Sequence, residues 1–131
     1  MPLKFKISAI VPATPTEVYK TWLDSKGHTK MTGSKAKISD KVGAAFEAWD
    51  GYITGANLEL LPSKLIVQSW RTTEFDETDQ DSRLEIILLA VRGGTKVTLS
   101  HSNLPTHGEQ YRQGWVESYF EPMKAYFEEK K

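Results

Sequence analysis

The side chains that most often bind metals or transfer protons are scarce in this sequence. The chain has three histidines and no cysteine, which removes disulfides, thiolate metal sites and thiol nucleophiles together. His28, His101 and His107 have no carboxylate or histidine partner three or four residues further along that would form a helical metal site. No serine, histidine and acid can be grouped by spacing alone. We therefore predict no metal site, no cofactor and no catalytic residue.

His101 is the histidine with the clearest predicted position. Residues alternate between the two faces of a strand, so His101 shares a face with Val97 and Leu99, while Thr98 and Ser100 point the other way. We expect it to face inward. Two interpretations stay open: a core histidine paired with a backbone group or a tyrosine, or a contact to a bound ligand.

Arg112 is a charged residue in an apolar setting. On a helical wheel at about 100° per residue, it falls near the middle of the apolar arc of the last helix. Its guanidinium either extends to water from the helix end or stands at a cavity mouth, where it would hold an acidic head group by paired hydrogen bonds.

Four tryptophans come from separate segments that we expect to converge. Their rings either fill the core or line an open cavity, and indole N–H groups need partners when buried. The candidate cavity residues are Trp22, Trp49, Trp70, His101, Arg112, Trp115, Tyr119 and Met123.

The charges give little indication of a partner. The formal net charge is zero, and lysine and arginine are spread along the sequence rather than gathered into a stripe, which disfavours nucleic acid and anionic membrane surfaces. Acidic residues do cluster between Glu74 and Asp81. That loop is either a solvated turn or a docking surface for a basic partner.

The last helix, from about Gly108 to Phe127, organises the elements that would position these residues. Pro122 lies inside it and predicts a kink, with Glu121 displaced from ideal helical angles. The aromatic face cannot stand alone in water, so the preceding chain must form a surface to receive it. Its apolar half consists of Tyr111, Trp115, Val116, Tyr119, Phe120, Met123, Tyr126 and Phe127.

The N-terminal part shows one strand and two short helices. Alternation from Leu3 to Ala9 predicts a strand that ends at Pro12. Thr14, Pro15 and Glu17 then form a helix start of the capping-box type. A second short helix begins at Asp24 or Ser25, reaches Met31 and ends at Gly33.

Further strands are predicted by apolar alternation between turn residues. The fold class is α+β: a curved antiparallel sheet of about six or seven strands wrapped around the long C-terminal helix, in a single domain over residues 1–131. The predicted strands are Ala36–Ile38, Ala44–Trp49, Gly51–Leu60, Lys64–Arg71, Ser82–Val91 and Thr95–Ser102.

An ordered set of residues across nearly the whole chain resembles a known family. The set is Phe46, Trp49, Gly51, Ile53, Gly55, Leu58–Leu60, Pro62, Ile66–Arg71, Ser82, Thr95–Val97, Pro105, Gly114–Trp115, Tyr119–Phe120 and Pro122. It resembles the C-terminal domain of activators of the heat-shock protein 90 ATPase and their small bacterial relatives. These belong to the START-like (SRPBCC) helix-grip superfamily, so the resemblance implies a cavity between sheet and helix that often holds apolar molecules.

From these observations we expect a non-enzymatic binding domain that holds a small apolar or amphipathic ligand between the sheet and the C-terminal helix. The first alternative is a chaperone-linked interaction module whose partner is a heat-shock protein 90-type chaperone, with a role in the stress response. The second is an enzyme of unknown reaction. No apolar stretch approaches the roughly 20 residues that a membrane span needs, and we expect a cytoplasmic protein.

Overall fold

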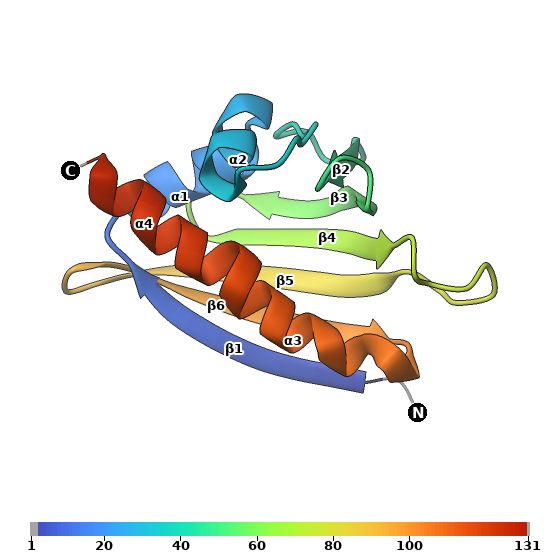
Figure 1. Cartoon of the computed structure of the whole chain (residues 1–131). Coiled ribbons are helices and arrows are strands. Elements are labelled where there is room, and N and C mark those ends of the chain that lie inside the picture. Colours follow the sequence, from blue (N-terminus) through green and yellow to red (C-terminus); the bar gives the residue numbers. More distant parts are fainter. Residues whose placement is uncertain (1–2, 131) are drawn as a thin grey trace.

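A six-stranded antiparallel sheet in the order β1-β6-β5-β4-β3-β2 forms the frame of the computed structural model, which describes residues 3–130. Strands β2 to β6 follow one another as a meander, and β1 closes onto β6 (Figure 1). The expected α+β fold and its strand number are confirmed. The strands are β1 (Leu3–Val11), β2 (Ala45–Ala48), β3 (Ile53–Leu61), β4 (Leu65–Thr72), β5 (Ser82–Val91) and β6 (Gly94–Leu104).

The two short helices begin and end where the local sequence predicts. Thr14 Oγ1 accepts the backbone N–H of Glu17 at 3.1 Å, and a Glu17 carboxylate oxygen accepts the backbone N–H of Thr14 at 3.1 Å, which completes the capping box. Asp24 caps the second helix, and Gly33 ends it in the left-handed region at φ 83°. These helices are α1 (Pro15–Trp22) and α2 (Ser25–Thr32).

The predicted strand Ala36–Ile38 was wrong. A single bridge joins this segment to Glu47, and no ladder forms. The physical reason lies in α2, whose hydroxyl groups take over the backbone bonds. The N–H groups of Ala36 and Ile38 donate to the side chains of Thr29 and Ser25, at 3.0 and 2.9 Å. The segment is therefore fastened to a helix rather than to the sheet.

The long C-terminal helix contains a wide π turn in its middle. Five of its buried aromatic and methionine side chains recur every fourth position, and in an ideal α-helix such a stripe drifts by about 40° per step. A wider turn uses more residues and brings the stripe back into line. The buried stripe is Tyr111, Trp115, Tyr119, Met123 and Phe127. The helix consists of η1 (Thr106–Glu109), α3 (Gln110–Trp115), η2 (Val116–Phe120) and α4 (Glu121–Glu129).

Pro122 follows the π turn directly. The expected displacement of Glu121 was wrong, since its φ of −64° and ψ of −50° are helical. Its N–H donates to the carbonyl of Val116, five residues back. Widening the turn in front of a proline relieves the clash between the ring and the preceding carbonyls, so the helix continues in phase.

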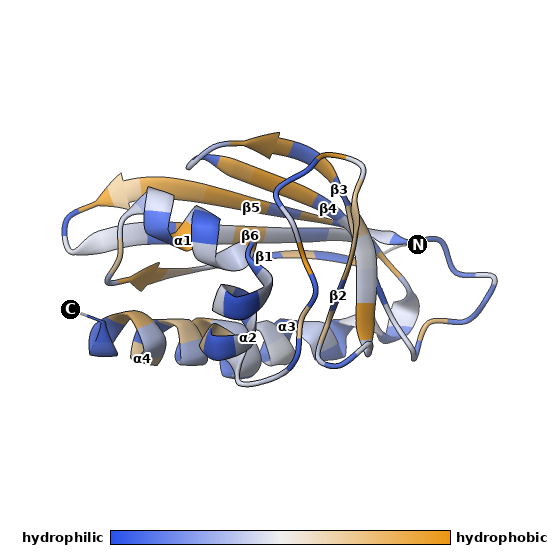
Figure 2. Ribbon diagram, turned by 90° about the horizontal axis from the view of Figure 1, so that it is seen from above, coloured by the Kyte–Doolittle hydropathy of each residue, from blue (hydrophilic) through white to orange (hydrophobic). Residues whose placement is uncertain are grey.

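The helix lies along one side of the curved sheet, with α1 and α2 beside it (Figure 2). Apolar side chains from both layers form one continuous core. It includes Trp22, Trp70 and Trp115, and Trp49 packs against it. Trp49 alone among the tryptophans is only partly buried. Within residues 3–130, no helix is both long enough and apolar enough to cross a membrane.

Candidate functional site

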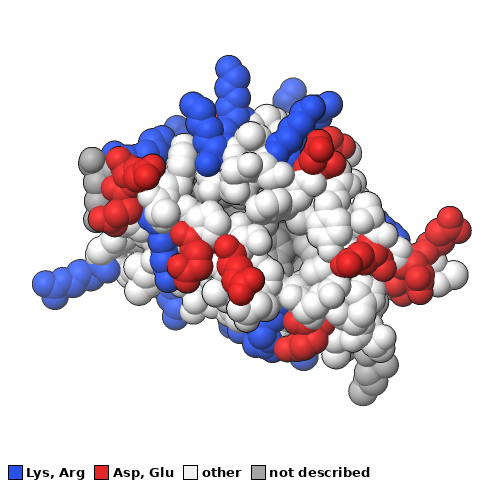
Figure 3. All heavy atoms as spheres, in the orientation of Figure 1, with Lys and Arg blue, Asp and Glu red and all other residues white. Residues whose placement is uncertain are grey.

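A pocket of about 330 Å³ opens between the C-terminal helix and the sheet, next to the turn that joins β2 and β3. Figure 3, drawn from the helix side, shows the surface hollowed near the middle of this face. Six of the nine lining residues are aromatic. The pocket is lined by Trp49, Tyr52, Ile53, Trp70, Tyr111, Gly114, Trp115, Ser118 and Tyr119.

Gly114 forms the open part of the helical wall. A Cβ atom built on this residue meets no heavy atom within 4 Å. Glycine inside a helix is less favourable than alanine by about 1 kcal/mol, because it loses more backbone freedom on folding. The helix therefore carries a destabilising residue at a position where a side chain would occupy the pocket.

Trp49 reaches the pocket from a strained turn. Its φ is 54° and that of Asp50 is 56°, so two residues with side chains adopt the left-handed region ahead of Gly51. Such a conformation costs on the order of 1 kcal/mol or more for a bulky residue. The result is that the indole of Trp49 stands edge to face with Tyr119, with ring centres 6.2 Å apart.

Two polar groups at the pocket have no partner among residues 3–130. They are the hydroxyl of Ser118 and the indole N–H of Trp70. The tyrosine hydroxyls are engaged instead. Tyr52 donates to Glu74, and the Tyr111 hydroxyl lies 3.4 Å from the same carboxylate oxygen. Partial burial and the bond to Glu74 raise the pKa of Tyr52, and that bond lowers the pKa of the Glu74 carboxyl.

Behind the pocket, His101 sits fully buried in a chain of hydrogen bonds. Trp115 donates its indole N–H to Nδ1 of His101 at 3.0 Å, so the ring proton is on Nε2. That nitrogen donates to Ser82 Oγ at 2.8 Å, and Ser82 donates to the carbonyl of Trp70 at 2.6 Å. Burial lowers the pKa of His101 to about 3. The inward direction was predicted, but the expected backbone or tyrosine partner was wrong.

His28 forms a second buried link, which the sequence did not indicate. Its Nδ1 lies 2.8 Å from the Trp22 carbonyl and therefore carries the proton, so Nε2 accepts the hydroxyl proton of Tyr119 at 2.9 Å. Burial lowers the pKa of His28 and raises that of Tyr119. The ring of Trp22 contacts the rings of His28, Tyr119 and Trp115, and its own N–H has no hydrogen-bond partner among residues 3–130.

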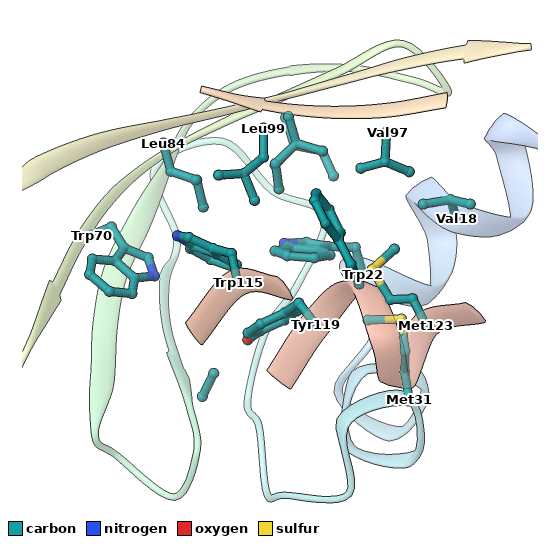
Figure 4. Packing of buried hydrophobic residues seen from close by; sticks show 14 of the residues in the cluster. Val18, Trp22, Met31, Trp70, Leu84, Val97, Leu99, Trp115, Tyr119 and Met123 are labelled. Carbon is teal, nitrogen blue, oxygen red and sulfur yellow. The ribbon is translucent and has the colours of Figure 1, made fainter. Parts of the chain in front are cut away.

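The structure brings together four of the eight predicted cavity residues and separates the others from them. Trp49, Trp70, Trp115 and Tyr119 line the pocket. The remaining four do not line it: Trp22, His101 and Met123 lie in the packed interior, and Arg112 is exposed. Figure 4 shows Trp22 and Met123 packed beside Trp115 and Tyr119. The space under the helix is thus filled by side chains, and the pocket lies at its margin.

Arg112 lies outside the apolar arc where the uniform wheel placed it. Its side chain is 46% exposed, and Nε donates to a Glu109 carboxylate oxygen at 2.9 Å. The guanidinium carbon lies 5.0 Å from the ring centre of Phe5, a cation–π contact at the sheet edge. A wheel with even spacing misplaces residues ahead of a π turn, because the phase changes there.

The described residues contain no group of three or more histidines, cysteines or acids that could hold a metal ion. The pocket walls supply aromatic surface, together with the Ser118 hydroxyl and the Trp70 indole N–H, which have no hydrogen-bond partner among residues 3–130. This arrangement suits the binding of an apolar group better than acid–base chemistry.

A curved antiparallel sheet closed on a long C-terminal helix, with two short helices after the first strand, defines the helix-grip class of α+β proteins. The chain belongs to the family described as Activator of Hsp90 ATPase homolog 1-like protein, whose sequence model matches residues 12–128.

A human relative agrees with the family assignment, and two solved structures share the fold. The chain is 27% identical over 115 residues to the human activator of 90 kDa heat shock protein ATPase homolog 1, covering 87% of this chain and 34% of the human protein. It therefore spans about a third of that relative. An HSP90 activator from Plasmodium falciparum has a similar structure, with a TM-score of 0.84, 24% identity and 94% of each chain covered. An Aha1 dimer from Colwellia psychrerythraea gives a TM-score of 0.74 at 17% identity, covering 87% of this chain and 88% of that one.

Proposed function

We propose that this chain is a non-enzymatic binding domain whose aromatic pocket holds a small apolar or amphipathic molecule. Gly114 is the observation that carries the proposal. It is a helix-interior glycine with open space at its Cβ position, and it forms part of the pocket wall. Packing does not require glycine there, and any larger side chain would reduce the pocket.

The walls define the chemistry of the guest. Aromatic rings favour a flat or compact apolar group, and about 330 Å³ is near the lower end of the volumes that small-molecule sites have, roughly 300–1,000 Å³. The N–H of Trp70 and the hydroxyl of Ser118 favour a guest with one hydrogen-bond acceptor, such as a carbonyl or hydroxyl oxygen. No charged side chain lines the pocket, so the guest is neutral at its buried end.

Nuclear magnetic resonance tests this proposal with naphthol and a medium-chain alcohol as probes. The four indole N–H signals act as reporters, because Trp49, Trp70 and Trp115 line the pocket and Trp22 does not. The expected result is a saturable shift of the Trp70 signal with little change at Trp22. Equal shifts of all four signals, or none, would count against the pocket.

A Gly114→Leu variant should abolish the Trp70 shift by filling the pocket. Gln113→Leu is the matched control, since it adds the same side chain at the neighbouring, exposed position of the helix. If both variants bind the probes as the unmodified protein does, the probes bind elsewhere.

The second candidate function is a chaperone-linked interaction module in the cytoplasm. It is supported by the family and by the relatives named as activators of the heat shock protein ATPase. The test is an ATPase assay and a pull-down with the heat-shock protein 90 of the same organism. Stimulation or capture supports this function, and the absence of both removes it.

A further inference from the structure

The fold places Lys130, near the end of the chain, beside a lysine-rich segment near its start. From Lys20 to Lys41 the chain contains six lysines and two acidic residues, whereas Glu74 to Asp81 contains five acidic residues and no basic one. Figure 3 shows the basic side chains along the upper edge, over α1 and α2, and acidic ones at the loop on the right. The zero net charge therefore hides two regions of opposite sign.

A groove of about 670 Å³ lies within the basic region, between α1, α2, the end of α4 and residues 38–40. It has twice the volume of the aromatic pocket and shares no lining residue with it. The groove is lined by Tyr19, Lys20, Thr21, Leu23, Asp24, Lys26, Gly27, Lys30, Ile38, Ser39, Asp40, Tyr126 and Lys130.

The groove combines an apolar floor with a charged rim. Tyr19, Leu23 and Ile38 are at most 8% exposed and form the floor. The four lysines are exposed, and within residues 3–130 none of them takes part in a salt bridge. Lys130 is held over the ring of Tyr126, with Nζ 5.2 Å from the ring centre. The ammonium groups are thus available to a ligand.

Two carboxylates interrupt the basic rim. Asp24 accepts the backbone N–H of Gly27 at 2.7 Å and is fixed as the cap of α2, and Asp40 lies at the other side. Four lysines and two aspartates leave a net charge of +2 (4 − 2) around the groove. A uniform polyanion would meet both carboxylates, whereas a peptide can place its acidic side chains selectively.

We propose that this groove binds an acidic peptide segment of a protein partner, with carboxylates on the lysine rim and one apolar side chain on the Leu23–Ile38 floor. The concave apolar floor suits a side chain and has no counterpart in a phosphate backbone. The groove is separate from the aromatic pocket, so a negative result at one site leaves the proposal for the other site unaffected.

Fluorescence anisotropy tests the proposal with a short labelled polyglutamate peptide that carries a central phenylalanine. The protein should bind it at low salt and lose affinity as salt is raised, and a polylysine peptide of equal length should not bind. A variant combining Lys20→Glu, Lys26→Glu and Lys30→Glu should weaken binding by about tenfold or more. The amide signals of Gly27 and Ile38 should shift on binding in nuclear magnetic resonance spectra.

The control combines Lys64→Glu, Lys96→Glu and Lys6→Glu, which changes net charge equally at exposed or partly exposed positions outside the groove. It should bind the peptide nearly as well as the unmodified protein at the same salt concentration. Equal loss in both variants would overturn the proposal, since it would show attraction by net charge alone. Tighter binding of single-stranded DNA or phosphatidylserine vesicles than of the peptide, lost in the groove variant, would also overturn it.

Discussion

The indole nitrogen of Trp115 lies 3.0 Å from Nδ1 of His101 and donates its proton to it. This bond joins the C-terminal helix to β6 and requires a neutral imidazole, because a protonated Nδ1 has no lone pair to accept with. Ser82 satisfies the other ring nitrogen at 2.8 Å. The centre of the core therefore depends on the protonation state of one fully buried histidine.

Protonation of His101 should lower the stability of the protein as pH falls. Its pKa is about 3 in the folded protein against an ordinary value of 6.5, so its contribution is complete above pH 6.5 and is lost as pH falls toward 3. Between pH 7 and 5 this histidine alone should lower the free energy of unfolding by about 2 kcal/mol. Urea unfolding at several pH values measures it. His101→Gln should flatten the slope, while the exposed His107→Gln should not; equal slopes in all three proteins would contradict the account.

Two tryptophans allow the indole hydrogen bond to be separated from ring packing. Trp115→Phe removes a donor and leaves Nδ1 of His101 unsatisfied, whereas Trp22→Phe removes an N–H that has no hydrogen-bond partner in the described part of the chain. Both changes delete similar volume from buried positions, each 2% exposed. Trp115→Phe should therefore cost about 1–3 kcal/mol more than Trp22→Phe, as measured by urea unfolding. Equal costs would mean that the bond adds nothing.

Two glycines should respond to alanine with opposite signs. At Gly55 a Cβ would lie 1.9 Å from the backbone oxygen of Ser69 and 2.7 Å from the ring of Phe46, so strands β3 and β4 would have to separate. Gly55→Ala should destabilise the protein by at least about 2 kcal/mol. Gly114→Ala has open space and a helical backbone, and should stabilise it by about 0.5–1 kcal/mol. Thermal unfolding of both variants checks the prediction, which fails if Gly114→Ala destabilises.

Glu74 should hold the acidic loop against the pocket rim. Its carboxylate accepts hydrogen bonds from Tyr52 and Gln110, and the next residue, Phe75, is buried against the rings of Trp70 and Tyr111. Glu74→Ala should speed hydrogen exchange at the Phe75 amide, because the loop loses its fastening. Glu77→Ala, at an exposed position in the same loop, should leave that rate unchanged. Unaltered exchange in the Glu74→Ala variant would contradict this role, and would leave Phe75 and the bonds from Arg71 to the loop as its fastening.

The fold could be predicted because its determinants are local. A capping box, a glycine at a helix end and period-two alternation fix the elements, and the aromatic face of the last helix requires the sheet to receive it. The segment 36–38 and the π turn could not be predicted. The first depends on hydroxyls of Thr29 and Ser25 across space, and the second on the fit of a long buried stripe to a curved sheet.

The site could be predicted only in part. The aromatic residues that were expected to converge under the helix include four that line the pocket: Trp49, Trp70, Trp115 and Tyr119. A helical wheel shows which side chains of one helix share a face, but not which other elements cover a residue. It therefore did not show that Trp22 is buried in the core. Gly114 and Tyr52 were missed for a related reason, since a pocket is defined by the side chains that are absent from it as much as by those that line it.

Native mass spectrometry of the protein purified from its own host, beside the Gly114→Leu variant, tests directly whether the aromatic pocket holds a ligand. The unmodified protein should retain a small apolar or amphipathic compound, seen as one added mass, and the variant should not. A bare chain mass for the unmodified protein, or the same compound retained by Gly114→Leu, would contradict it.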